Sequence, residues 1–390
     1  MSAVTKVEQC LKQLIDVEER MAGATVLVRH HGEEVLYAQW GMADREKGIP
    51  IARDQIFRLY SQTKPVTAAA AMLLVERGLL DLMEPVEKFL PGFRNQKVAE
   101  GGGFVPVKRP VVVMDLLGMS AGIVYGGEDV AGKAADALMR EVDERMETDH
   151  PMTTVELANR IGELPLAFQP GERMRYSLCA DVLAAVIEVL DGRPYSTFLR
   201  EELFEPLGMK DTGFYVPVEK LDRLCGCYER RDGKLYPCEP RNAGIRDFTS
   251  EPAYASGGGG LCGTIDDYMA FATMLLQEGM WQGKRILSPQ SVRFLASAQL
   301  PYEERFKPWH GYEGYAYGKL MRQGVVPGHA PMFIRQGEYG WDGWLGVYFA
   351  NFPQEEMTIL MMMQIKDTGT SCMQRRVRNV LLALESQGDL

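Results

Sequence analysis

The sequence predicts an α/β (α+β) fold, in which strands from both ends of the chain form one antiparallel sheet and a mostly helical lobe is inserted between them. Two observations predict it. Residues 24–40 and 331–365 are rich in β-branched and aromatic residues and are interrupted by turn residues, as is typical of strands. The segments with helical spacing of apolar residues lie mainly between these regions. Because a sheet must cover its apolar face, we expect the terminal helices to flank it.

The N-terminal part predicts a helix followed by a β-hairpin. Within residues 1–19, the apolar residues that recur at helical spacing are Val7, Leu11, Leu14 and Ile15. Residues 24–29 and 34–40 are β-rich runs on either side of the polar turn at residues 30–32. This arrangement places two neighbouring strands close to the start of the chain.

Three central segments predict helices. Residues 67–78 form an apolar run that ends at Gly78, a residue suited to a helix C-terminus. Residues 180–190 form a second apolar run, which stops at Gly192. Residues 265–277 form a third, and Thr264 and Asp267 have the spacing of a capping box at its start.

The C-terminal part predicts strands at residues 331–336, 345–352 and 357–365, then a helix at 371–384. We therefore expect a sheet domain formed by residues 1–90 and 325–390. Residues 91–324 would form the mostly helical lobe of the same catalytic unit. Ligand pockets favour such boundaries, so a site is expected where the two parts meet.

The composition excludes several classes of protein. The chain has 390 residues, of which 46% are hydrophobic and 25% charged, as expected of a globular protein. Its net charge is −10 and no basic stripe is present, so we expect no nucleic-acid partner. The longest apolar stretch, residues 66–75, is about half of a membrane span, so no membrane association is expected. The N-terminal residues do not have the pattern of an export signal, and a cytoplasmic location is predicted.

The cysteines and the glycine-rich run predict no metal and no cofactor. Seven cysteines without a C-x-x-C motif do not form a complete disulfide framework. Cys225, Cys227 and Cys238 would need a fourth ligand from elsewhere to hold zinc. Residues 257–260 are all glycine but lack the lysine and hydroxyl residue of a phosphate-binding loop, which favours a tight backbone turn.

Ser61 is the first candidate nucleophile, because Ser61 and Lys64 have the S-x-x-K spacing. Pro65 is accommodated near the opening turn of a helix, so an apolar helix should begin close to Ser61. The two side chains would then lie one turn apart on one face. A lysine can serve as a base only if burial lowers its pKa, and the apolar surroundings favour such burial. The alternative is that Ser61 caps the helix and Lys64 is a solvated first-turn side chain.

Ser120 is the second candidate nucleophile, since residues 118–122 have the G-x-S-x-G spacing of a nucleophile elbow. An elbow needs a strand before it and a helix directly after it. Residues 111–113 could form the strand, but residues 123–127 do not begin a helix. We therefore interpret Ser120 as a loop residue.

Several ordered segments resemble the serine β-lactamase-like superfamily, which holds class C β-lactamases, D-alanyl-D-alanine peptidases and the family VIII carboxylesterases. The matching segments, spread over nearly the whole chain, are residues 57–67, 78–91, 170–177, 206–214 and 257–261. The resemblance implies an acyl-enzyme mechanism, in which Ser61 attacks a carbonyl and Lys64 and Tyr176 share the proton transfers. A tyrosine near an ammonium reaches its phenolate form more easily, which fits this role. The oxyanion donors implied by the resemblance are the N–H groups of Ser61 and Trp344, with residues 341–344 as the third motif.

Two departures from the β-lactamase pattern resemble the esterase branch. The second motif is Tyr176-Ser177-Leu178, where β-lactamases have an asparagine, and Trp341 stands in place of the lysine that holds a carboxylate. Removing a cation and adding aromatic residues suits an uncharged ester. The predicted substrate-binding residues are Tyr125, Trp341, Gly343 and Tyr339.

The resulting prediction is a serine hydrolase, most consistent with a carboxylesterase acting on small or medium acyl esters. The alternatives within the fold are a β-lactamase or D-alanyl-D-alanine carboxypeptidase acting on an amide, and an acyltransferase. A non-catalytic binding protein is the alternative from another class, and the presence of Ser61, Lys64 and Tyr176 disfavours it. The polar stretch at residues 217–246 is interpreted as a mobile flap over the pocket.

Overall fold

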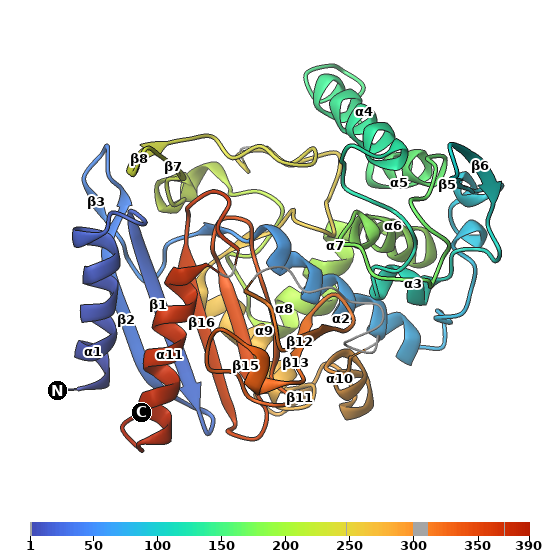
Figure 1. Cartoon of the computed structure of the whole chain (residues 1–390). Helices are drawn as coiled ribbons and strands as arrows, with labels where there is room; N and C mark the ends of the chain where they lie inside the picture. Colours follow the sequence, from blue (N-terminus) through green and yellow to red (C-terminus); the bar gives the residue numbers. More distant parts are fainter. Residues whose placement is uncertain (1, 247, 299–310, 370) are drawn as a thin grey trace.

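The computed structural model describes residues 2–246, 248–298, 311–369 and 371–390, and it confirms the predicted fold class. An antiparallel sheet of eight strands has helices on both faces (Figure 1). The strand order is β12-β13-β14-β15-β16-β1-β2-β3, so strands from the two ends of the chain meet in the middle. These strands are β1 (Gly23–His30), β2 (Glu33–Asp44), β3 (Ile49–Pro50), β12 (Tyr315–Tyr317), β13 (Arg322–Gly324), β14 (Tyr339–Asp342), β15 (Tyr348–Phe352) and β16 (Met357–Met363).

The central pair of strands joins the N-terminal and C-terminal parts. β1 pairs with β16 in an antiparallel register that places Ala24 opposite Met363 and His30 opposite Met357. Side chains alternate between the two faces, and both faces are buried here. The β16 side chains Met357, Ile359, Met361 and Met363 pack into one core, and Leu360 and Met362 pack into the other.

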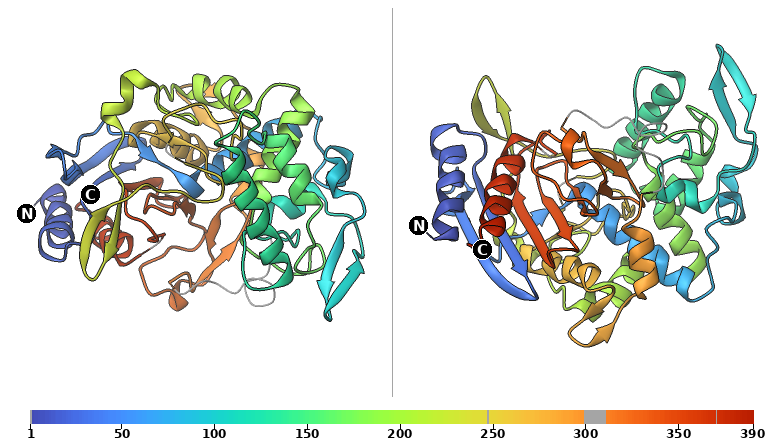
Figure 2. Two further views of the ribbon diagram at one scale, coloured as in Figure 1. Left: turned by 90° about the horizontal axis from the view of Figure 1, so that it is seen from above. Right: turned by 60° about the horizontal axis from the view of Figure 1, so that its bottom comes forward.

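Helices cover each face of the sheet. α1 (Ala3–Lys12) and α11 (Cys372–Ser386) lie side by side on one face, as Figures 1 and 2 show. α9 (Ile265–Leu276) covers the other face and contacts β15 and β16. The predicted cap of α9 is present, because the Thr264 hydroxyl accepts a hydrogen bond from the backbone N–H of Asp267 at 3.2 Å.

The remaining helices lie mainly beside the sheet, in the part of the molecule on the right of Figure 1. They are α2 (Thr63–Glu76), α3 (Val113–Leu117), α4 (Val130–Arg145), α5 (Thr154–Gly162), α6 (Cys179–Asp191), α7 (Tyr195–Leu199), α8 (Glu205–Leu207) and α10 (Pro289–Leu295). The short strands form separate pairs: β4 (Phe57–Arg58) with β9 (Cys262–Gly263), β5 (Lys97–Glu100) with β6 (Gly103–Pro106), β7 (Tyr228–Arg231) with β8 (Lys234–Pro237), and β10 (Met280–Trp281) with β11 (Lys284–Arg285).

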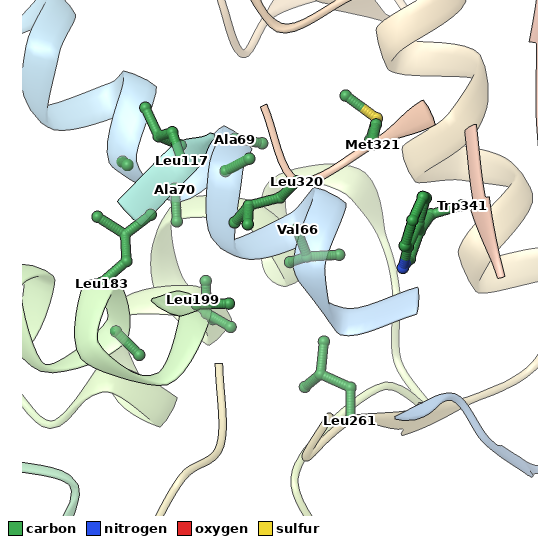
Figure 3. Close-up of a cluster of buried hydrophobic side chains, with 14 of the residues drawn as sticks. Val66, Ala69, Ala70, Leu117, Leu183, Leu199, Leu261, Leu320, Met321 and Trp341 are labelled. Atoms are coloured by element: carbon green, nitrogen blue, oxygen red, sulfur yellow. The ribbon is translucent and has the colours of Figure 1, made fainter. Parts of the chain in front are cut away.

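Helix α2 runs through the interior, and every residue from Thr63 to Leu74 is buried. A helix that is buried on all sides needs no polar face, which explains its continuous apolar sequence. Figure 3 shows Val66, Ala69 and Ala70 of α2 among apolar side chains from several other elements. The small alanine side chains allow α6 to approach α2 closely. Lys64 is therefore carried into the interior by its position in this helix.

Most predicted elements are present, but the strand expected at residues 331–336 is wrong. Met332 and Ile334 are buried there, so the apolar pattern reflects real burial. The backbone of Phe333, however, bonds to side chains of α11: its N–H donates to Asn379 and its carbonyl accepts from Arg378. The sheet instead contains β12 and β13, although residues 315–324 fall in the range that the sequence assigned to the helical lobe.

Among the described residues, no helix is both long enough and apolar enough to cross a membrane.

Candidate active site

Ser61 lies in a sharp turn between β4 and α2. Residues Tyr60–Gln62 form one turn of 3₁₀ helix that leads directly into α2, as the position of Pro65 predicts. Tyr60 has a left-handed backbone conformation, with φ of 44°, which is costly for a residue other than glycine. Its ring packs against Trp344 with centroids 5.1 Å apart, and its hydroxyl donates to the Pro240 carbonyl at 3.1 Å. These contacts hold the strained turn that presents Ser61.

The structure brings the three predicted catalytic side chains together. The hydroxyl of Tyr176 donates to Oγ of Ser61 at 2.6 Å, and Nζ of Lys64 donates to the same oxygen at 3.2 Å. Both distances allow direct proton exchange. The alternative of a solvated Lys64 is excluded, because this side chain is fully buried.

Lys64 makes three hydrogen bonds. Besides Ser61, its acceptors are the Tyr125 hydroxyl at 3.0 Å and the Gly258 carbonyl at 2.6 Å. An ammonium has three N–H donors, so these contacts account for all of them. The charge also lies 4.6 Å from the ring centroid of Tyr176, where a cation–π interaction stabilises it.

Tyr176 is enclosed by two aromatic side chains. Its ring centroid lies 5.5 Å from that of Tyr125 and 5.6 Å from that of Trp341, and the Trp341 indole N–H donates to its hydroxyl at 3.3 Å. Burial, together with the neighbouring Tyr176, raises the pKa of Tyr125 well above its ordinary value. Tyr125 therefore stays a neutral hydroxyl, and Tyr176 is the tyrosine that contacts Oγ of Ser61.

The second candidate, Ser120, is not exposed to a cavity. It is 1% exposed, and its hydroxyl donates to Asp115 at 3.3 Å. Its segment supports the loop that carries Tyr176 instead: the Met119 carbonyl accepts from the N–H of Arg175 at 3.0 Å. Ser120 is thus a loop residue, as predicted, and its segment helps to hold the loop that carries Tyr176.

The end of β14 lies directly against the turn that carries Ser61. A Cβ atom at Gly343 would lie 2.3 Å from the Leu59 carbonyl oxygen, so only glycine permits this approach. The next residue, Trp344, donates its indole N–H to Asp367 at 2.6 Å. The backbone N–H of Trp344 donates no hydrogen bond to another residue that the structure describes.

A cavity of about 910 Å³ opens beside Ser61 and Tyr176. Four predicted residues line it, namely Tyr125, Trp341, Gly343 and Trp344. Part of the stretch at residues 217–246 also contributes, through Asn242, Ala243 and Ile245. The placement of Tyr339 in the pocket is wrong: its ring packs on Phe349 in the sheet and its hydroxyl accepts from Asn351 at 3.1 Å. The alternation of β14 turns Tyr339 and Trp341 to the same face, but Tyr339 lies two positions before Trp341, the first residue of β14 that lines the cavity.

The sequence did not predict Asp181, Gly258 or Tyr312 as site residues, although all three line the cavity. The Gly258 carbonyl accepts from Lys64 Nζ, and Asp181 in the first turn of α6 accepts from the Gly258 N–H. Tyr312 packs near Trp341 with ring centroids 6.3 Å apart. Tyr312 donates to Asp342, which forms a buried ion pair with Arg322 at 2.7 Å. An acidic residue early in an otherwise apolar helix was the available signal for Asp181.

Among the described residues, no group of three or more His, Cys, Asp or Glu side chains is placed to hold a metal ion. Sγ atoms of Cys227 and Cys238 lie 3.5 Å apart, across the hairpin of β7 and β8.

Comparison with known proteins shows that the chain belongs to the beta-lactamase family, whose family model matches residues 6–383. It is a serine hydrolase of this family, which confirms the predicted resemblance. The esterase EstB of Burkholderia gladioli is 36% identical over 272 residues, covering 65% of this chain and 65% of that protein. An uncharacterised protein of Mycobacterium tuberculosis is 30% identical over 360 residues, covering 88% and 86%.

Comparison with a solved structure supports the same family assignment. EstCE1, a hydrolase with promiscuous acyltransferase activity, is 26% identical and superposes with a TM-score of 0.82. The superposition covers 97% of this chain and 98% of EstCE1. The similarity to EstB and EstCE1 agrees with the predicted placement near the esterase branch.

Proposed function

We propose that this protein is a carboxylesterase that cleaves esters of small or medium acyl groups through an acyl-enzyme on Ser61. One observation carries the proposal: Oγ of Ser61 is within 2.6 Å of the Tyr176 hydroxyl and 3.2 Å of Lys64 Nζ, beside an open cavity. A serine needs a neighbouring base to become a nucleophile, and this geometry supplies one.

In the acylation step, the phenolate form of Tyr176 accepts the proton of Ser61 while Oγ bonds to the ester carbonyl carbon. The ammonium of Lys64 stabilises the phenolate beforehand, because opposite charges attract and Nζ lies 4.6 Å from the ring centroid of Tyr176. The tetrahedral intermediate collapses as the bond to the alcohol oxygen breaks. Tyr176 returns the proton to that oxygen, and the alcohol leaves.

In the deacylation step, Tyr176 accepts a proton from a water molecule whose oxygen bonds to the acyl carbon. The bond to Ser61 Oγ then breaks, the proton passes to Oγ, and the carboxylic acid is released. Water and ester are consumed, and acid and alcohol are formed, so the enzyme returns to its starting state.

The proposed oxyanion donors are the backbone N–H groups of Ser61 and Trp344. Support comes from the close packing of Gly343 on Leu59, which brings the end of β14 to the nucleophile turn. The absence of an acceptor for the Trp344 N–H among the described residues leaves this group available to a substrate.

Uncharged esters are the proposed substrates, because the described cavity wall has no lysine or arginine. Four aspartates contribute to it, namely Asp136, Asp181, Asp342 and Asp367. A substrate carboxylate would find no lysine or arginine to pair with in the described cavity wall, which disfavours penicillins and cephalosporins.

The test is hydrolysis of nitrophenyl butyrate, with a chromogenic cephalosporin in parallel. We expect ester turnover that is lost in Ser61→Ala, labelling of Ser61 by a fluorophosphonate probe in the intact mass, and little cephalosporin hydrolysis. A cephalosporin rate far above the ester rate would favour the β-lactamase alternative. An unlabelled Ser61 together with no ester turnover would favour the binding protein.

Acyl transfer is a second candidate, favoured by the similarity to EstCE1, a hydrolase with promiscuous acyltransferase activity. The two reactions differ in whether water or an alcohol resolves the acyl-enzyme. Adding a primary alcohol to the ester assay separates them, because transfer produces a new ester at the expense of free acid.

A further inference from the structure

The carboxylate of Asp181 is bound entirely by one segment of the cavity wall. Asp181 is 2% exposed, and its Oδ1 accepts three hydrogen bonds. They come from the Tyr254 hydroxyl at 2.5 Å, the Ser256 hydroxyl at 2.6 Å and the backbone N–H of Gly258 at 3.0 Å. A buried carboxylate needs such donors to replace its lost hydration. Its place in the first turn of α6 also favours the negative charge.

The same segment contacts α2 through two carbonyl groups. The Gly257 carbonyl accepts from the Thr67 hydroxyl at 2.6 Å, and the Gly258 carbonyl accepts from Lys64 Nζ at 2.6 Å. The peptide group between Gly257 and Gly258 is thus held at both ends, by Thr67 and by Asp181. Because a peptide group is planar, these two contacts fix where the following carbonyl, that of Gly258, points.

The approach of Asp181 to this segment is very close. A Cβ atom at Gly258 would lie 2.5 Å from Oδ2 of Asp181, and one at Gly257 would lie 2.4 Å from the Ala180 carbonyl oxygen. The glycines therefore permit a direct contact between α6 and the backbone that faces Lys64. This explains the glycine run at residues 257–260 as a spacing requirement rather than a phosphate loop.

We propose that Asp181 is a positioning residue, which holds the Gly258 carbonyl and through it the Lys64 ammonium that faces Ser61 and Tyr176. The contact from Lys64 to Gly258, at 2.6 Å, is shorter than its contact to Ser61, at 3.2 Å. Loss of the carbonyl would free the ammonium to rotate away from Ser61. This inference rests on the proposed function, since it assigns Asp181 a task in the same proton transfer.

The test compares Asp181→Ala with Asp267→Ala in the full chain. Asp267 is a matched control: it is 9% exposed, lies in the first turn of α9 and also accepts from a backbone N–H and a hydroxyl, those of Asp211 and Thr212. Misplacement of a catalytic group by about 1 Å lowers the reaction rate about 100-fold. We therefore expect kcat on nitrophenyl butyrate to fall about 100-fold in Asp181→Ala, with little change in KM. Asp267→Ala should lower Tm but leave kcat near the wild-type value.

Two further readouts separate positioning from simple destabilisation. Asp181→Asn keeps an acceptor for Gly258 and should recover most of the lost kcat. The pH profile of kcat/KM should shift in Asp181→Ala but not in Asp267→Ala, because only the former disturbs the surroundings of Lys64. If Asp181→Ala does not fold, Tyr254→Phe removes one donor to the same carboxylate and should lower kcat several-fold at unchanged fold.

The rate at which a fluorophosphonate probe labels Ser61 tests the positioning role of Asp181 separately from the esterase proposal. A wild-type rate of labelling in Asp181→Ala, or an equal loss of kcat in Asp267→Ala, would overturn the positioning role and leave the esterase proposal standing. Failure of the wild-type protein to label at Ser61 would overturn both.

Discussion

The hydroxyl of Tyr176 donates a 2.6 Å hydrogen bond to Oγ of Ser61, although 115 positions separate the two residues in the sequence. Tyr176 lies in the loop before α6, and Ser61 in the turn before α2. Both helices are buried and in contact, so their packing determines the distance between the two hydroxyl groups. The short distance between the Tyr176 and Ser61 hydroxyl groups thus depends on how α2 and α6 pack together.

Tyr176→Phe and Tyr125→Phe form a matched pair of variants, because both tyrosines lie within reach of Lys64. General acid–base catalysis contributes at least about 100-fold, so Tyr176→Phe should lower kcat by about that factor. Tyr125→Phe removes only one acceptor of the ammonium and should cost about tenfold. Steady-state hydrolysis of nitrophenyl butyrate checks this, and a larger loss in Tyr125→Phe would reassign the base.

Lys64→Ala should abolish ester turnover while the protein stays folded. In the proposed mechanism, Lys64 supplies the charge that stabilises the Tyr176 phenolate, and its three hydrogen bonds and its cation–π contact with Tyr176 all lie at the site. Far-UV circular dichroism and Tm report on folding, and fluorophosphonate labelling reports on Ser61. Wild-type turnover in this variant would place the base elsewhere.

Gly343→Ala should reduce both stability and activity, because the added methyl group would overlap the Leu59 carbonyl and the Val347 side chain. Overpacking of this kind costs about 1–3 kcal/mol. It would also move the end of β14 away from Ser61. Gly328→Ala is the control, since nothing lies within 4 Å of its Cβ position. Thermal unfolding and kcat measured for both variants test the prediction, which fails if the two behave alike.

The lowered pKa of Lys319 should make the stability of the protein depend on pH. Burial lowers the pKa of Lys319 from 10.5 to about 8 in the folded protein. Between pH 8 and about 10 the unfolded chain therefore binds more protons, and the free energy of unfolding should rise with pH. Lys319→Met removes this contribution, so wild type should gain stability relative to the variant across that range. Urea unfolding at pH 8 and pH 10 measures the difference, and parallel behaviour of the two proteins would contradict the prediction.

Several helices and caps could be predicted from local sequence patterns, because the residues that cause them to form lie close together in the sequence. The helix after Ser61 follows from Pro65 and the apolar run, and the cap at Thr264 follows from its spacing to Asp267. Residues 331–336 show the limit of such patterns. Their apolar side chains are buried as expected, but side chains of α11 take the backbone hydrogen bonds that a strand partner would have made.

The family and the spacing of Ser61 to Lys64 follow from contiguous motifs of the sequence, and the same motifs predict Ser61 as the nucleophile. The side chains that surround this pair depend instead on the tertiary structure. Trp341 reaches Tyr176, Tyr339 does not reach the cavity, and Asp181 reaches Gly258 through contacts between distant segments. Such contacts depend on how helices and strands pack, because local sequence periodicity specifies the face on which a residue lies but not the residues that it meets there.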